Sequence, residues 1–185
     1  MIASGLAEKN DTRRLFVRAE WIELWKKLDG NTNIILSGPP GTGKSSLVWW
    51  WCCWHAQRRD LRWTHLGRTG AVEMADFTSR NITTYNPLIN PDYISEISTT
   101  AVPTLVIDGL TRESNMMAAA FSWWKDDSTH RRVIYVTSIQ SPLNIEDLQH
   151  SDLTKGMSSR WEPEEYELAC KDQTFLGLVE AMQTD

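Results

Sequence analysis

The stretch that most constrains this chain is residues 38–45, Gly-Pro-Pro-Gly-Thr-Gly-Lys-Ser, which fits the phosphate-binding loop pattern G-x-x-x-x-G-K-[ST]. An apolar run, residues 34–36, precedes it, and a second run, residues 46–51, follows it. We therefore expect a buried strand, the loop and a helix in that order. Glycines let backbone N–H groups turn toward a phosphate, and a helix N-terminus attracts the same anion. A Gly- and Pro-rich turn without a ligand is the alternative, and the strand–loop–helix context favours phosphate binding.

Two side chains of this loop have separate candidate roles. The ammonium group of Lys44 supplies a mobile positive charge for the β- and γ-phosphates of a nucleoside triphosphate. The hydroxyl group of Ser45 is a candidate ligand of Mg²⁺. We expect the nucleotide to be ATP or GTP, with ATP favoured. The predicted nucleotide-binding residues are Gly38, Pro39, Pro40, Gly41, Thr42, Gly43, Lys44, Ser45 and Ser46.

Another apolar run, residues 104–107, lies downstream and is followed directly by Asp108. A carboxylate at the end of such a strand would hold Mg²⁺ together with Ser45, directly or through water. The alternative is a turn formed by Asp108 with Gly109. Many ATP hydrolases of this architecture carry a glutamate directly after the aspartate, whereas this chain has Gly109, and the nearest acid downstream is Glu113. We therefore expect hydrolysis to be slow, to use another base, or to depend on a partner.

Polar residues also end a third apolar strand, predicted over residues 132–138. Thr137 and Ser138 can reach the γ-phosphate or its attacking water from there, and ordinary turn formation before Pro142 is an equal alternative. The catalytic candidates are thus Lys44, Asp108, Thr137 and Ser138. The candidates for a charge-stabilising arginine, among which the sequence does not choose, are Arg112, Arg131, Arg132 and Arg160.

The alternation of strands with helices predicts an α/β fold of three layers with a mainly parallel sheet. We expect a helix that Asp11 or Thr12 caps and Gly30 ends, and a small β-meander over residues 71–77 and 81–85. The length predicts a single domain over residues 1–185, with residues 1–11 as a loose lead-in. The other predicted strands are 33–37, 61–66 and 157–159, and the other predicted helices are 44–58, 92–98, 113–125, 145–148 and 164–182.

Composition excludes several classes of protein. The net charge is −5, so the surface as a whole does not favour nucleic acid. Three cysteines do not form a disulfide framework, and no apolar run is long enough to cross a membrane. Residues 1–5 lack the pattern of a secretory signal. We expect either an intracellular protein or one whose targeting segment lies outside this chain.

Ten tryptophans stand out in a chain of 185 residues. Trp49, Trp50, Trp51 and Trp54 lie on the predicted helix after the loop, where successive side chains advance 100° and cover more than one face. We expect most tryptophans to form an aromatic core. The alternatives are a surface that a host protein or another partner covers, and a platform that stacks the bases of DNA.

The chain resembles the P-loop NTPase domain of the Crinkler effectors and their relatives, the retrotransposon-hot-spot-type proteins. The resemblance extends from residue 16 to residue 169. Besides the loop, the stretches that carry it are residues 16–18, 21–25, 105–109, 136–138 and 161–166. The stretch 105–109, which contains Asp108, is similar to the family's Walker B sequence, and that sequence commonly ends in Asp-Gly.

This resemblance implies an effector that is secreted and acts in a host cell, often in its nucleus. The family's trafficking motif and its C-terminal toxin domain are not found in this sequence. The first hypothesis is an Mg²⁺-dependent nucleoside triphosphatase that can self-assemble to supply an arginine. The second is a nucleotide-dependent module that recruits a partner with little turnover, and the third is a small-molecule kinase.

Overall fold

The computed structural model describes residues 17–30, 32–56, 60–67, 70–110, 115–138 and 153–170. Within these ranges the chain alternates strands with helices, as the sequence predicts. The elements are α1 (Ala19–Asp29), β1 (Ile34–Ser37), α2 (Lys44–His55), β2 (Leu61–Leu66), β3 (Val72–Asp76), β4 (Asn81–Tyr85), α3 (Asp92–Thr99), β5 (Thr104–Leu110), α4 (Met116–Asp126), β6 (Arg132–Thr137), β7 (Thr154–Met157) and α5 (Pro163–Cys170). The predicted lead-in and the predicted helix over 145–148 lie outside the described residues.

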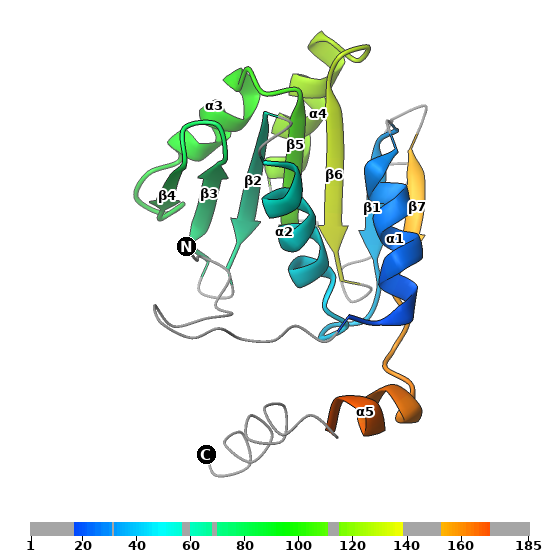
Figure 1. Cartoon of the computed structure of the whole chain (residues 1–185). Coiled ribbons are helices and arrows are strands. Elements are labelled where there is room, and N and C mark those ends of the chain that lie inside the picture. The colour runs from blue at the N-terminus through cyan, green and yellow to red at the C-terminus, as the bar shows by residue number, and fades with distance from the viewer. Residues whose placement is uncertain are drawn as a thin grey trace.

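The seven strands form one sheet in the order β4-β3-β2-β5-β6-β1-β7 (Figure 1). Strands β2, β5, β6, β1 and β7 pair in parallel, and β3 and β4 pair antiparallel at one edge. The predicted α/β fold and its small meander are confirmed. The meander extends the sheet beyond β2, so it is part of the same layer. No helix in the described ranges has the length and apolar character that crossing a membrane requires.

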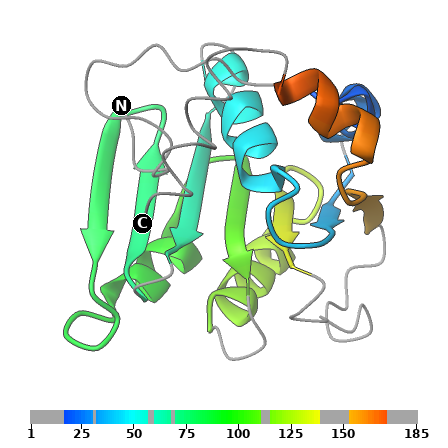
Figure 2. The same ribbon diagram turned by 90° about the horizontal axis from the view of Figure 1, so that it is seen from below.

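Helices cover both faces of the sheet. Seen along the sheet from below, α1 and α2 lie on one side and α3 and α4 on the other (Figure 2). A separate apolar cluster fills each interface. Strand β6 lies inside the sheet between β5 and β1, and all six of its residues are buried, which explains the continuous apolar run at residues 133–136.

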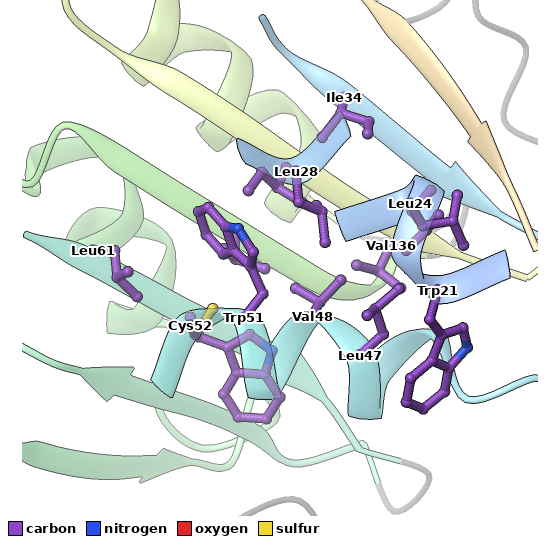
Figure 3. Close-up of a cluster of buried hydrophobic side chains, with 14 of the residues drawn as sticks. Trp21, Leu24, Leu28, Ile34, Leu47, Val48, Trp51, Cys52, Leu61 and Val136 are labelled. Atoms are coloured by element: carbon purple, nitrogen blue, oxygen red, sulfur yellow. The ribbon is translucent and has the colours of Figure 1, made fainter. Parts of the chain in front are cut away.

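Figure 3 shows the cluster beneath α1 and α2, with Trp21 and Trp51 among its members. Trp51 is fully buried against the sheet, and Trp49 is partly buried against the same cluster. Trp50 and Trp54 are exposed over 38% and 61% of their surface, and the ring of Trp50 packs edge-on against Trp25 of α1. The prediction of an aromatic core is therefore correct for part of the α2 tryptophans, and a partner for the exposed ones stays a prediction.

Several boundaries differ from the predicted ones, and those of α1, β5 and β7 differ near the predicted site. Helix α1 begins at Ala19 with Arg18 as its N-cap residue, whereas Asp11 and Thr12 lie outside the described residues. Strand β5 continues past Asp108 to Leu110. Strand β7 spans Thr154–Met157 instead of residues 157–159. Its Gly156 argues against a strand in the sequence, but a Cβ there would be 3.0 Å from Leu36 of β1, so tight strand packing accounts for the glycine.

Candidate functional site

The glycine-rich loop lies at the carboxyl edge of the sheet between β1 and α2 and is closely covered. Gly43 has a φ of 83°, and a Cβ there would clash with the ring of Trp21 from α1. Gly38 has a φ of 155°, and a Cβ there would clash with the carbonyl of Ser158, the residue after β7. Both positions require glycine for backbone conformation and for space. The predicted loop is thus held from two sides by other parts of the chain.

Lys44 is buried and bonded to its own loop. Its Nζ donates to the carbonyl oxygens of Gly38 at 2.9 Å and Pro39 at 2.7 Å, and to Thr42 Oγ1 at 3.2 Å. Burial lowers the pKa of Lys44, and the negative charges of Asp108 and Glu20 offset part of that effect. The three N–H donors of the ammonium group are therefore all bonded within the loop, and a bound phosphate would take the place of at least one of these bonds.

The first turn of α2 faces the same place. Its N-cap residue is Gly43 in a left-handed conformation, and among the described residues no side chain caps the helix. Helix N-terminal N–H groups that lack a side-chain acceptor attract anions, and the helix dipole adds to that attraction. The loop and the helix start together form an arrangement suited to a phosphate chain.

Ser45 and Asp108, which are 63 positions apart in sequence, meet at this edge. The Ser45 hydroxyl donates to Asp108 Oδ1 at 2.9 Å. Asp108 is 1% exposed, and its Oδ2 is buried without a well-aligned hydrogen-bond partner among the described residues. A hydroxyl oxygen beside a buried carboxylate is an oxygen-only donor set of the kind that Mg²⁺ prefers. The residues present therefore fit a magnesium ion held jointly with phosphate oxygens.

Thr137 and Ser138 lie between these groups. Strand β6 runs between β5, which carries Asp108, and β1, which leads into the loop. Thr137 ends β6 at the same carboxyl edge and is buried. Its Oγ1 lies 3.4 Å from the carbonyl oxygen of Ser138. The sheet order thus brings both predicted sensor residues to the site, and their role remains a prediction.

The structure gives a physical reason for the glycine after Asp108. The ladder between β5 and β6 shifts register between Asp108 and Leu110, and Gly109 at the shift has a φ of 80°. A Cβ on Gly109 would lie 2.6 Å from the carbonyl oxygen of Leu66 at the end of β2. A glutamate therefore does not fit at position 109.

The arginine candidates separate clearly. Arg131 and Arg132 lie at the start of β6, at the edge of the sheet opposite the loop, so neither lies beside the loop within the same chain. Arg132 donates to the carbonyl oxygen of Leu28 at 2.7 Å, and the Arg131 guanidinium lies 5.1 Å from the ring centre of Trp123. Their guanidinium groups satisfy backbone groups at the ends of helices and loops on that edge of the sheet. Arg112 lies outside the described residues.

Arg160 follows β7 beside a cluster that the sequence motifs did not reveal. At its centre is Arg18, which is 1% exposed. Its guanidinium donates to Glu165 Oε2 at 2.7 Å and to the carbonyl oxygen of Arg160 at 2.9 Å, and it also pairs with Glu20. Trp161 Nε1 donates to the carbonyl oxygen of Gly41 at 3.2 Å. These bonds tie α1, the segment after β7 and the start of α5 to the loop.

His65 is a second residue that the motifs missed. It is the penultimate residue of β2, next to β5, and its Nδ1 lies 3.3 Å from Asp108 Oδ2. Burial lowers the pKa of His65, but Asp108 and, less strongly, Glu73 raise it, and the net direction is upward. In the sequence, the available signal for this residue was its polar side chain near the end of the predicted strand 61–66. It pointed to the site only once β2 was known to neighbour β5.

The sheet order, the loop and the carboxylate together define the fold of a P-loop NTPase. No protein-family model matches the chain, and no curated protein matches it. Among solved structures, it is similar to THEP1 from the hyperthermophile Aquifex aeolicus, with 15% identity and a TM-score of 0.44 over 76% of this chain and 95% of that one. It is also similar to AMPPCP-bound DnaA from Aquifex aeolicus, with 12% identity and a TM-score of 0.47. That match covers 88% of this chain and 58% of DnaA.

Proposed function

We propose that this chain is a Mg²⁺-dependent nucleoside triphosphatase. The observation that carries the proposal is the hydrogen bond between Ser45 and Asp108, because it joins the hydroxyl group behind the loop to a buried carboxylate on another strand. A turn without a ligand gives no reason to bury a carboxylate there. Within the described residues no group of three or more His, Cys, Asp and Glu side chains could hold a metal alone, so phosphate oxygens would complete the set.

The chain's own groups divide the work of hydrolysis. Loop N–H groups and Lys44 hold the phosphates in line with the attacking water, and Thr137 and Ser138 orient that water or sense the γ-phosphate. The water oxygen bonds to the γ-phosphorus while the bond to the β-bridging oxygen breaks, which yields a nucleoside diphosphate and inorganic phosphate. The proton that the water loses passes to a phosphate oxygen or to solvent, and Lys44 balances charge on the leaving diphosphate. Bound Mg²⁺ would supply further charge stabilisation, with Ser45 and Asp108 as its protein ligands. The preference for ATP over GTP is an expectation without an adenine pocket identified in the sequence, and the Crinkler-type effector role rests on the sequence resemblance.

The test is phosphate release from ATP and from GTP, with and without Mg²⁺. Lys44→Ala should abolish turnover, because it removes the positive charge that the loop holds for the phosphates. Lys26→Ala is the matched control, since Lys26 is 67% exposed and pairs with Glu23 in α1. Equal phosphate release by wild type and Lys44→Ala would refute the proposal. Measuring the rate per molecule across protein concentrations would also test self-assembly.

A second candidate is a nucleotide-dependent module that recruits a partner with little turnover. The observation in its favour is Gly109, where the backbone leaves no space for a glutamate that activates water. Trp50 and Trp54 offer an exposed surface on α2, directly behind the loop. Tight binding of a nucleotide without release of phosphate would favour this candidate over the first.

A further inference from the structure

Asp108 belongs to a row of three side chains across neighbouring strands. Strand β2 lies between β5 and β3, and His65 pairs in register with Asp108 on one side and with Glu73 on the other. Register partners in a sheet project from the same face. This is the face that α2 covers, because Asp108 bonds to Ser45 of α2. His65 therefore lies on the metal-binding side of the sheet.

The ring of His65 is held in a fixed plane. It stacks on Trp63, two residues earlier in β2, with ring centres 5.1 Å apart and an interplanar angle of 3°. Trp63 is in turn packed edge-on by Trp49 of α2, with ring centres 4.7 Å apart. Because Trp63 is 1% exposed, this stack has little freedom to move. The aromatic cluster behind the loop thus directs one edge of the His65 ring at Asp108.

The two oxygens of Asp108 consequently have different neighbours. Oδ1 accepts from the hydroxyl of Ser45, and Oδ2 lies 3.3 Å from His65 Nδ1. A carboxylate oxygen can only accept, so an imidazole that approaches it donates from a protonated Nδ1. At this separation neither atom has a well-aligned hydrogen bond among the described residues, and site hydrogen bonds of this kind commonly tighten when ligand binds.

We propose that His65 is a positioning residue of the metal site, which holds Asp108 Oδ2 so that Oδ1 stays directed at Ser45 and Mg²⁺. The inference rests on the proposed function and adds a residue to it. Hydrogen-bonded partners behind metal ligands fix the orientation of those ligands, and their loss typically costs about 10- to 100-fold in metal affinity or activity. His65 contacts Asp108 from the neighbouring strand β2. Position 109, directly after Asp108, is a glycine and has no side chain that could make such a contact.

The test measures the affinity for a fluorescent, non-hydrolysable ATP analogue at increasing Mg²⁺ concentrations. The quantity compared between variants is the Mg²⁺ concentration at which the gain in affinity is half-maximal. His65→Ala should raise this concentration by about 10- to 100-fold. His65→Phe keeps a ring on Trp63 but removes the donor, so it should show the same loss. His65→Asn places an amide donor near the Nδ1 position and should recover most of the affinity. His130→Ala is the matched control, because His130 is 81% exposed and contacts Asp127 at the turn before β6.

Wild-type Mg²⁺ dependence in His65→Ala or His65→Phe would overturn the inference, as would an His65→Asn variant as impaired as His65→Ala. These results would leave the proposed function intact if wild type still binds and hydrolyses nucleotide. A wild-type protein that binds no analogue, or whose binding ignores Mg²⁺, would instead overturn the proposed function and this inference with it. Far-UV circular dichroism of each variant separates a lost contact from a lost fold.

Discussion

Gly109 provides a direct test of why the site lacks a glutamate after Asp108. We predict that Gly109→Ala destabilises the chain for two separable reasons. The residue has a φ of 80°, where a side chain is strained, and its Cβ would lie 2.6 Å from the carbonyl oxygen of Leu66. Gly70 is the matched control, because it has a φ of 81° and an added Cβ there meets nothing within 4 Å.

The magnitude follows from the two terms. A left-handed conformation costs an L-residue roughly 1–2 kcal/mol, and both variants share this cost. Forcing an extra carbon into packed structure costs roughly a further 1–3 kcal/mol, and only Gly109→Ala carries it because the obstacle is backbone of β2. The expected difference in the free energy of unfolding corresponds to a Tm lower by roughly 2–12 °C for Gly109→Ala than for Gly70→Ala in a chain of this size.

Urea and thermal unfolding, followed by circular dichroism, measure both variants against wild type. Equal stability of Gly109→Ala and Gly70→Ala would refute the argument from space, and a stable Gly109→Ala at wild-type level would refute the backbone conformation as well. In either case the absence of a glutamate at position 109 would need a reason other than geometry.

Two further predictions concern charged contacts. Arg18→Ala should lower the free energy of unfolding by about 3 kcal/mol, because it leaves Glu165 and Glu20 beside one another without their cation; adding Glu165→Gln should recover part of the loss, and a double-mutant cycle with no coupling would contradict this. Burial raises the pKa of Asp76, but bonds from Arg62 and from the Ser79 backbone lower it by more, so the net direction is downward. Its stabilisation is then full above about pH 4 and is lost as the pH falls through the folded-state pKa; Asp76→Asn should show a smaller loss of stability than wild type between about pH 5 and pH 3 in acid titrations of unfolding.

The loop and the elements that flank it were predictable because short-range sequence patterns determine them. The loop pattern, the apolar strands and the helix after the loop all follow from spacing within a few residues. The meander over β3 and β4 was also predictable, since β-branched residues there are flanked by turn signals. These patterns require no knowledge of which strands become neighbours.

His65 and Arg18 were missed for a different reason. Each acts on residues that are far away in sequence: His65 contacts Asp108 because β2 pairs with β5, and Arg18 contacts Glu165 because α1 lies beside the start of α5. A single histidine or arginine has no periodicity that marks it. The sequence does not choose among the arginine candidates for the same reason, since only the direction of β6 places Arg131 and Arg132 away from the loop.

The sheet order therefore determines the chemistry next to Asp108. In the proposed function, the contacts of the P-loop and its lysine with phosphate are made within a few residues of sequence. The proposed hydrolytic step depends in addition on the groups beside the Asp108 carboxylate. Strand β6 places Thr137 on one side of Asp108, and β2 places His65 on the other. Position 109 supplies no further side chain, because it is a glycine with no space for a Cβ. A water-orienting or water-activating group among the described residues would therefore come from the ends of β2 or β6.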